Sequence, residues 1–121
     1  MSRVENIIRG DDQTVPIPVT GFFTTLIGAT AYLLVIPTTS AVSDTTPDPN
    51  AVIKSTLGPF VTEQTVLNFE LSSVAADDNS TLVPVASYKW YARVVEADGN
   101  ITTIMLEPNT VKVVAPGDEV C

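Results

Sequence analysis

The segment from residue 88 to residue 106 limits the possible folds of this chain more than any other stretch. Two runs of alternating β-branched and aromatic residues flank the pair Asp98-Gly99. Asp and Gly tolerate the positive φ angles that a tight turn between antiparallel strands requires, so this arrangement is the strongest short-range indication of a β-hairpin. The segment therefore predicts a hairpin with strands at 88–96 and 100–106.

The period of two in the first hairpin strand assigns its side chains to opposite faces of a sheet. One face carries Tyr88, Trp90, Ala92 and Val94. These residues are apolar or aromatic, so we expect this face to line the core. Tyr91 lies on the opposite face with Lys89 and Arg93, and we predict that Tyr91 is exposed there as a candidate interface residue.

Alternating runs recur along the rest of the chain, separated by turn residues. We predict further strands at residues 4–9, 13–20, 29–36, 51–56, 65–71 and 110–114. A short helical turn fits only at 72–83. Seven or eight strands without a helix of normal length predict an all-β fold, an immunoglobulin-like antiparallel β-sandwich. We assign residues 1–121 to a single domain, with the sandwich at 4–114 and terminal extensions at 1–3 and 115–121.

The composition limits the function. The chain has 14 acidic and 6 basic residues and a formal net charge of −8. Binding to nucleic acid requires clustered basic side chains, so we do not expect it. The apolar run at 22–36 is shorter than the about 20 residues of a membrane helix, so we do not expect membrane insertion. There is no His, and the single Cys is Cys121, so the sequence offers no catalytic triad, zinc site or internal disulfide.

We therefore expect no enzymatic activity, no cofactor, no metal and no small-molecule substrate. The acidic pairs Asp11-Asp12 and Asp77-Asp78 lack the spacing of a Ca²⁺-binding loop. The tripeptide at 9–11 spells an integrin-binding motif, but Gly and Asp are ordinary turn residues between strands, and we interpret it as a turn.

Two connections carry the candidate contact residues. Phe22 and Phe23 are apolar residues on the connection at 21–28, and Val42 and Pro47 belong to a long loop at 37–50. Exposed apolar residues on connections and long loops are frequent docking surfaces. The alternative for Phe22 and Phe23 is that they cap the core of their own domain.

Short motifs follow one another along the chain in an informative order. They are Ile-Arg-Gly-Asp-Asp-Gln-Thr at 8–14, Leu-Ile-Gly-Ala-Thr at 26–30, Ala-Val-Ile-Lys-Ser-Thr at 51–56, Leu-Asn-Phe-Glu-Leu at 67–71, Tyr-Lys-Trp-Tyr-Ala-Arg at 88–93 and Ala-Asp-Gly-Asn at 97–100. In this order they resemble small β-sandwich modules of tailed bacteriophages, including the N-terminal domain of baseplate upper proteins. The resemblance covers most of residues 4–114. The chain departs from the family at 26–30, where the family has Leu-Thr-Gly-Ala-Thr, and in its more apolar connection at 22–27.

The resemblance implies a structural role in a virion that is assembled in the host cytoplasm. Symmetric copies would dock to one another and to other virion proteins. Because no shaft or receptor-binding domain follows the sandwich, we expect a tail or baseplate, neck or capsid-decoration subunit. The rival hypothesis is a carbohydrate- or receptor-binding module of the virion, with Tyr91 as the aromatic residue on which a sugar would stack.

Overall fold

The computed structural model describes residues 6–19, 25–43 and 48–115, and only the backbone of residues 105–108. These residues form seven strands and contain no helix. The strands are β1 (Asn6–Ile8), β2 (Gln13–Pro18), β3 (Thr30–Pro37), β4 (Ile53–Leu57), β5 (Val66–Leu71), β6 (Ala86–Val95) and β7 (Ile101–Val114). The helical turn predicted at 72–83 is wrong, because this segment consists of turns and an isolated bridge between Ser72 and Ser80.

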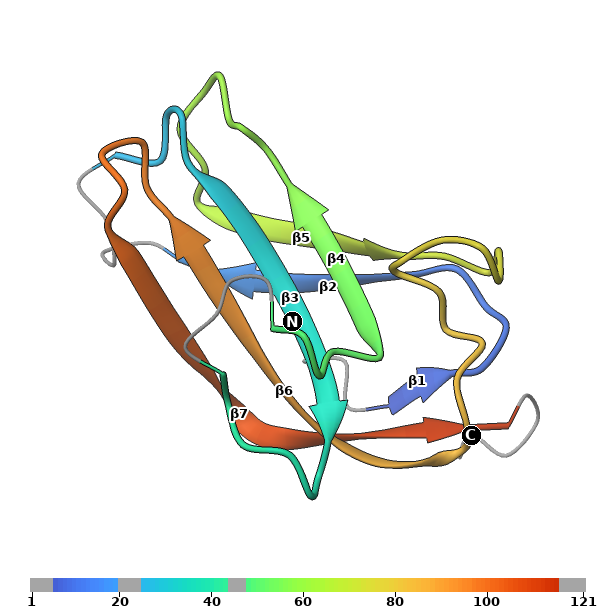
Figure 1. Ribbon diagram of the computed structural model, residues 1–121. Helices are drawn as coiled ribbons and strands as arrows, with labels where there is room; N and C mark the ends of the chain where they lie inside the picture. The colour runs from blue at the N-terminus through green and yellow to red at the C-terminus, as the bar shows by residue number, and fades with distance from the viewer. Residues whose placement is uncertain (1–5, 20–24, 44–47, 116–121) are drawn as a thin grey trace.

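The strands form two sheets that pack against each other (Figure 1). The larger sheet has the order β1-β7-β6-β3-β4, and the smaller sheet consists of β2 and β5. In Figure 1, β2 and β5 run across the back of the larger sheet. The predicted all-β sandwich is confirmed, and its immunoglobulin-like type stays a prediction.

The strand pairing differs from the prediction in two places. β1 pairs with β7 in parallel, with Ile8 opposite Val114, so the sandwich is not wholly antiparallel. The predicted strands at 100–106 and 110–114 are one long strand, β7, whose register against β6 shifts between Lys89 and Tyr91. The residues between the two predicted strands continue the extended backbone. The irregularity accommodates residues of β7 that have no partner on β6.

The predicted hairpin between β6 and β7 is confirmed. The Glu96 N–H donates to the Asn100 carbonyl at 2.8 Å, and the Gly99 N–H donates to the Glu96 carbonyl at 2.9 Å. Gly99 has a φ of +93°, which L side chains rarely adopt, so the turn needs glycine at this position.

The core lies between the two sheets. Its largest fully buried residues are Trp90 and Phe69, which belong to opposite sheets. The predicted inward face of β6 is confirmed, because Tyr88, Ala92 and Val94 belong to the same cluster. The Tyr88 hydroxyl donates to the Pro84 carbonyl at 2.6 Å and fixes the start of β6 to the connection before it.

Candidate functional site

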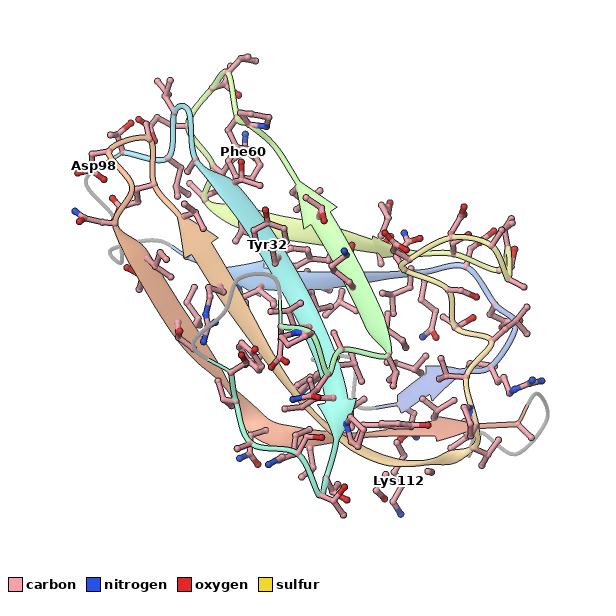
Figure 2. The ribbon with its side chains drawn as sticks, in the orientation of Figure 1. Tyr32, Phe60, Asp98 and Lys112 are labelled. Atoms are coloured by element: carbon pink, nitrogen blue, oxygen red, sulfur yellow. The ribbon has the colours of Figure 1, made fainter. Side chains whose placement is uncertain are left out.

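Three connections meet at one end of the sandwich and form the surface that we call the loop end, residues 25–29, 58–64 and 96–101. Figure 2 labels Phe60 and Asp98 at this end. The Gly28 N–H donates to the Phe60 carbonyl at 2.8 Å, and the Phe60 N–H donates to the Ala29 carbonyl at 3.1 Å. These reciprocal backbone hydrogen bonds join the first two connections.

Glu63 adds a second link between the same two connections. Its carboxylate accepts the Leu26 N–H at 2.8 Å and the hydroxyl of Thr25. The hydrogen bond from Thr25, followed by that from the Leu26 N–H, holds the pKa of Glu63 below its ordinary value. Glu63 is therefore a charged acceptor that fixes the turn before β3, although it lies at the surface.

Gly28 brings the third connection into the loop end. Its φ is +83°, and a Cβ placed on it would lie 2.9 Å from the Cβ of Ala97 in the β6–β7 turn. Only glycine allows both this backbone conformation and this close approach. The three connections therefore pack against one another at this end of the sandwich.

We expect Gly28→Ala to lower the free energy of unfolding by about 1–2 kcal/mol, because the alanine must adopt a left-handed conformation and also displace Ala97. Gly99→Ala is the matched control, since Gly99 has a φ of +93° but nothing within 4 Å of an added Cβ. Urea unfolding of both variants measures the difference. Equal losses of stability would contradict the close packing of Gly28 on Ala97.

The loop end exposes apolar side chains beside acidic ones. Ile27 is 50% exposed and Val61 is 86% exposed. A shallow hollow of about 150 Å³ is lined by Thr25, Ile27, Glu96, Ala97 and Asp98. This surface combines aliphatic contact area with negative charge on a backbone that hydrogen bonds hold in place, which suits contact with another protein.

The prediction that Tyr91 is exposed is wrong. Tyr91 does lie on the face of β6 opposite the core, but its exposed fraction is 0%. It packs with Leu34 and Ile36 in a second apolar cluster on the outer face of the larger sheet. The loop between β3 and β4 covers this cluster, and its Asp48 accepts the Tyr91 hydroxyl at 2.6 Å.

Asp48 is the centre of this cover. Its carboxylate also accepts the backbone N–H groups of Ser43 at 3.1 Å and Asn50 at 2.8 Å. Burial alone would raise the pKa of Asp48, but the hydrogen bonds from Tyr91, Asn50 and Ser43 and the charge of Arg93 together hold the pKa below its ordinary value. Burial, and then the hydrogen bond to Asp48, raise the pKa of Tyr91.

Arg93 of β6 also contacts the loop between β3 and β4. Its Nη1 donates to the Ser43 carbonyl at 2.7 Å, and its Nε donates to the Thr103 Oγ1 at 3.0 Å. The guanidinium also lies 5.1 Å from the centroid of the Tyr91 ring, a cation–π distance. Arg93 and Asp48 thus hold the β3–β4 loop on the sheet.

The other predicted contact residues have different outcomes. Val42 is exposed on the β3–β4 loop, and its role as a contact residue stays a prediction. Phe22, Phe23 and Pro47 lie outside the described residues. Ile27 and Val61 were not predicted as exposed residues, because the apolar run around Ile27 equally fits a buried segment. Asp48 stands between two prolines, which resembles any surface turn.

A larger polar hollow of about 460 Å³ lies at the far end of β2 and β5. Each of its three carboxylates already accepts a hydrogen bond from the protein. The pairs are Asp12 with the Ser73 N–H at 2.6 Å, Glu70 with the Thr14 hydroxyl at 2.6 Å and Asp77 with the Ser72 hydroxyl at 2.7 Å. The carboxylates that line the hollow are therefore already used as hydrogen-bond acceptors within the protein.

Across the described ranges 6–19, 25–43 and 48–115, no group of three or more His, Cys, Asp or Glu residues is placed to hold a metal ion. Within the same ranges there is also no helix long and apolar enough to cross a membrane. No family model, curated protein or solved structure matches the chain.

Proposed function

We propose that this protein is a structural module that works by protein–protein packing, as a tail or baseplate, neck or capsid-decoration subunit of a tailed-bacteriophage virion. The observation that carries the packing role is the loop end. Ile27 and Val61 are exposed on connections that backbone hydrogen bonds and Glu63 hold together. A preorganised apolar surface loses little conformational entropy on association. The virion part of the proposal rests on the order of motifs that resembles phage β-sandwich modules.

The strand order supports the immunoglobulin-like type that the resemblance implies. The order β7-β6-β3-β4 opposite β2-β5 matches two sheets of such a sandwich that carry strands G, F, C and C′ opposite B and E. Tyr88 at the start of β6, with its hydroxyl bonded to the carbonyl four residues upstream, corresponds to the tyrosine corner of this fold. We accordingly propose an immunoglobulin-like module in which the loop end is formed by the connections β2–β3, β4–β5 and β6–β7.

The rival hypothesis of carbohydrate binding requires Tyr91 to be exposed. A sugar stacks on an exposed aromatic face, whereas Tyr91 is fully buried and its hydroxyl donates to Asp48 of the β3–β4 loop. Trp90 belongs to the core and is equally unable to stack on a ligand. We therefore do not propose that function.

We expect the double variant Ile27→Asp, Val61→Asp to be depleted at least tenfold from purified phage particles, because two charges would be placed in the packed contact. Val74→Asp is the matched control: Val74 is 55% exposed, but lies in the 72–83 segment rather than on the loop end. Quantitative mass spectrometry of particles from complemented infections measures the copy number of each variant. Absence of the wild-type chain from the particles, or equal incorporation of both variants, would refute the proposal.

A further inference from the structure

The backbone edges of the two sheets differ in how well they are protected. An unpaired strand edge presents free N–H and C=O groups to which another strand can add, and proteins normally block such edges. The edge strands of the larger sheet are β1 and β4, and both strands of the smaller sheet are edges. β7 is also an edge along its first part, because β1 pairs only with Lys112–Val114.

The β2 edge is blocked by proline. The Val19 N–H donates to the Thr65 carbonyl at 2.9 Å, so in the antiparallel register the odd-numbered residues of β2 direct their backbone groups toward β5. The even-numbered residues face outward, and two of the three are Pro16 and Pro18. Because proline has no N–H, this edge lacks the donors that an added strand would need.

The β4 and β5 edges are partly covered. The Lys54 N–H, which faces away from β3, donates to the Asp78 carbonyl at 2.9 Å. On β5 the Glu70 carbonyl accepts the Ser55 hydroxyl at 2.8 Å and the Asn79 side-chain amide at 2.7 Å. These bonds occupy the outer groups at the middle of β4 and the end of β5.

The first part of β7 has none of these protections. The Glu96–Asn100 hydrogen bond fixes the register, so Thr102 and Ile104 direct their backbone groups toward β6. The backbone groups of Ile101, Thr103 and Met105 face outward, and among the described residues they have no hydrogen-bond partner. Residues 101–106 contain no proline and no charge, and Ile101 is 54% exposed. This is the sequence and geometry of a strand that accepts another strand.

We propose that the β7 edge at Ile101–Met105 pairs with the same edge of a second copy, antiparallel about a two-fold axis at Thr103. This proposal deepens the proposed packing function by assigning the contact between copies. A two-fold at Thr103 places Ile101 opposite Met105 of the partner subunit and joins the two larger sheets into one. The contact uses the same surface on both copies and closes with two chains.

Each copy carries a net charge of −8, so a register that set acid against acid would weaken the contact. Pairing about Thr103 sets Asp98 opposite Pro108 of the partner subunit and Glu107 opposite Gly99 of the partner subunit, since opposite residue numbers sum to 206. No acid therefore directly faces another acid, the arrangement that destabilises strand pairs. The central Thr103 pair is among the favourable cross-strand combinations.

Thr103→Pro tests the proposal, because proline removes an outward N–H that no described residue accepts. We expect sedimentation velocity over a dilution series to show a wild-type dimer, and the variant to raise the dissociation constant at least tenfold. Thr14→Pro is the matched control: it places proline at an outward-facing position of the β2 edge, outside the proposed contact, and its dissociation constant should stay within about twofold of wild type. Unchanged dimerisation of Thr103→Pro, or equal weakening by Thr14→Pro, would overturn the proposal.

Hydrogen exchange of the wild-type protein gives a second measurement that needs no variant. We expect the amides of Ile101 and Thr103 to become protected as concentration rises through the dimerisation range. Free exchange at every concentration, or protection in a monomer, would overturn the proposal, the latter because a segment of the same chain would then cover the edge. The two proposals fail separately: particles that contain the chain while the isolated protein stays monomeric reject only the β7 contact, whereas a β7 dimer that is absent from particles rejects only the virion role.

Discussion

Trp90→Ala is expected to lower the free energy of unfolding by about 3–5 kcal/mol, a loss typical of truncating a large buried aromatic side chain. Trp90 is buried at the centre of β6 and faces the smaller sheet, where Phe69 of β5 belongs to the same cluster. Replacing the indole removes its transfer free energy and leaves a cavity that two hydrogen-bonded sheets cannot close. The loss is a large fraction of the 5–15 kcal/mol that stabilises a typical domain.

The measurement is thermal and urea unfolding followed by far-UV circular dichroism. Fluorescence cannot serve for both proteins, because Trp90 is the only tryptophan of the chain. We expect the melting temperature to fall by roughly 10–20 °C. Trp90→Phe keeps an aromatic ring and should lose less, and so provides a folded variant if Trp90→Ala does not fold. Val61→Ala, at an 86% exposed position, should change stability by no more than about 0.5 kcal/mol. A loss below about 1 kcal/mol for Trp90→Ala would contradict the central packing of this residue.

The success of the hairpin prediction and the failure at Tyr91 have one physical cause. The two-residue alternation along a strand indicates which side chains share a face. This alternation correctly placed Trp90 on the inward face and Tyr91 on the outward face. It contains no information on whether another segment covers the outward face. That cover comes from the β3–β4 loop, whose Pro, Ser, Thr and Asp residues are typical of an exposed loop.

The pairing of distant strands was also beyond local reasoning. The parallel contact of β1 with β7 joins residues more than 100 positions apart, and no local pattern determines it. The strands themselves could be predicted because their alternation and turn residues are local properties. The prolines of β2 are compatible with its place at a sheet edge, since a central strand needs every N–H. The loop end could not be predicted either, because it depends on tertiary contacts. From the sequence alone Gly28 is an ordinary turn residue, and only the structure shows that it lies against Ala97.

Asp48→Ala is expected to have the second largest effect, a loss of about 2–4 kcal/mol, because it removes a buried charged acceptor of three hydrogen bonds. Asp48 is 3% exposed, and its loss leaves the Tyr91 hydroxyl buried without this acceptor. The amides of Ser43 and Asn50 also lose their acceptor. We expect faster hydrogen exchange at these two amides, whereas the Glu96 amide of the β6–β7 hairpin should exchange as in the wild type. Unchanged exchange at Ser43 and Asn50 would contradict the role of Asp48 in holding the loop.

Asp48 also makes stability depend on pH in a defined direction. Hydrogen bonds to the carboxylate hold its pKa in the folded protein below the ordinary value of 3.8. The stabilisation is therefore complete above that value and is lost as the pH falls through the folded pKa. We expect wild-type stability, measured by urea unfolding at steps from about pH 6 to about pH 2, to fall more steeply below about pH 4 than that of Asp48→Asn. Glu63→Gln is the control, because the pKa of Glu63 is also lowered but its carboxylate lies at the surface of the loop end. If Asp48→Asn and the wild type lose stability in parallel as the pH falls, the carboxylate of Asp48 does not hold the β3–β4 loop in place.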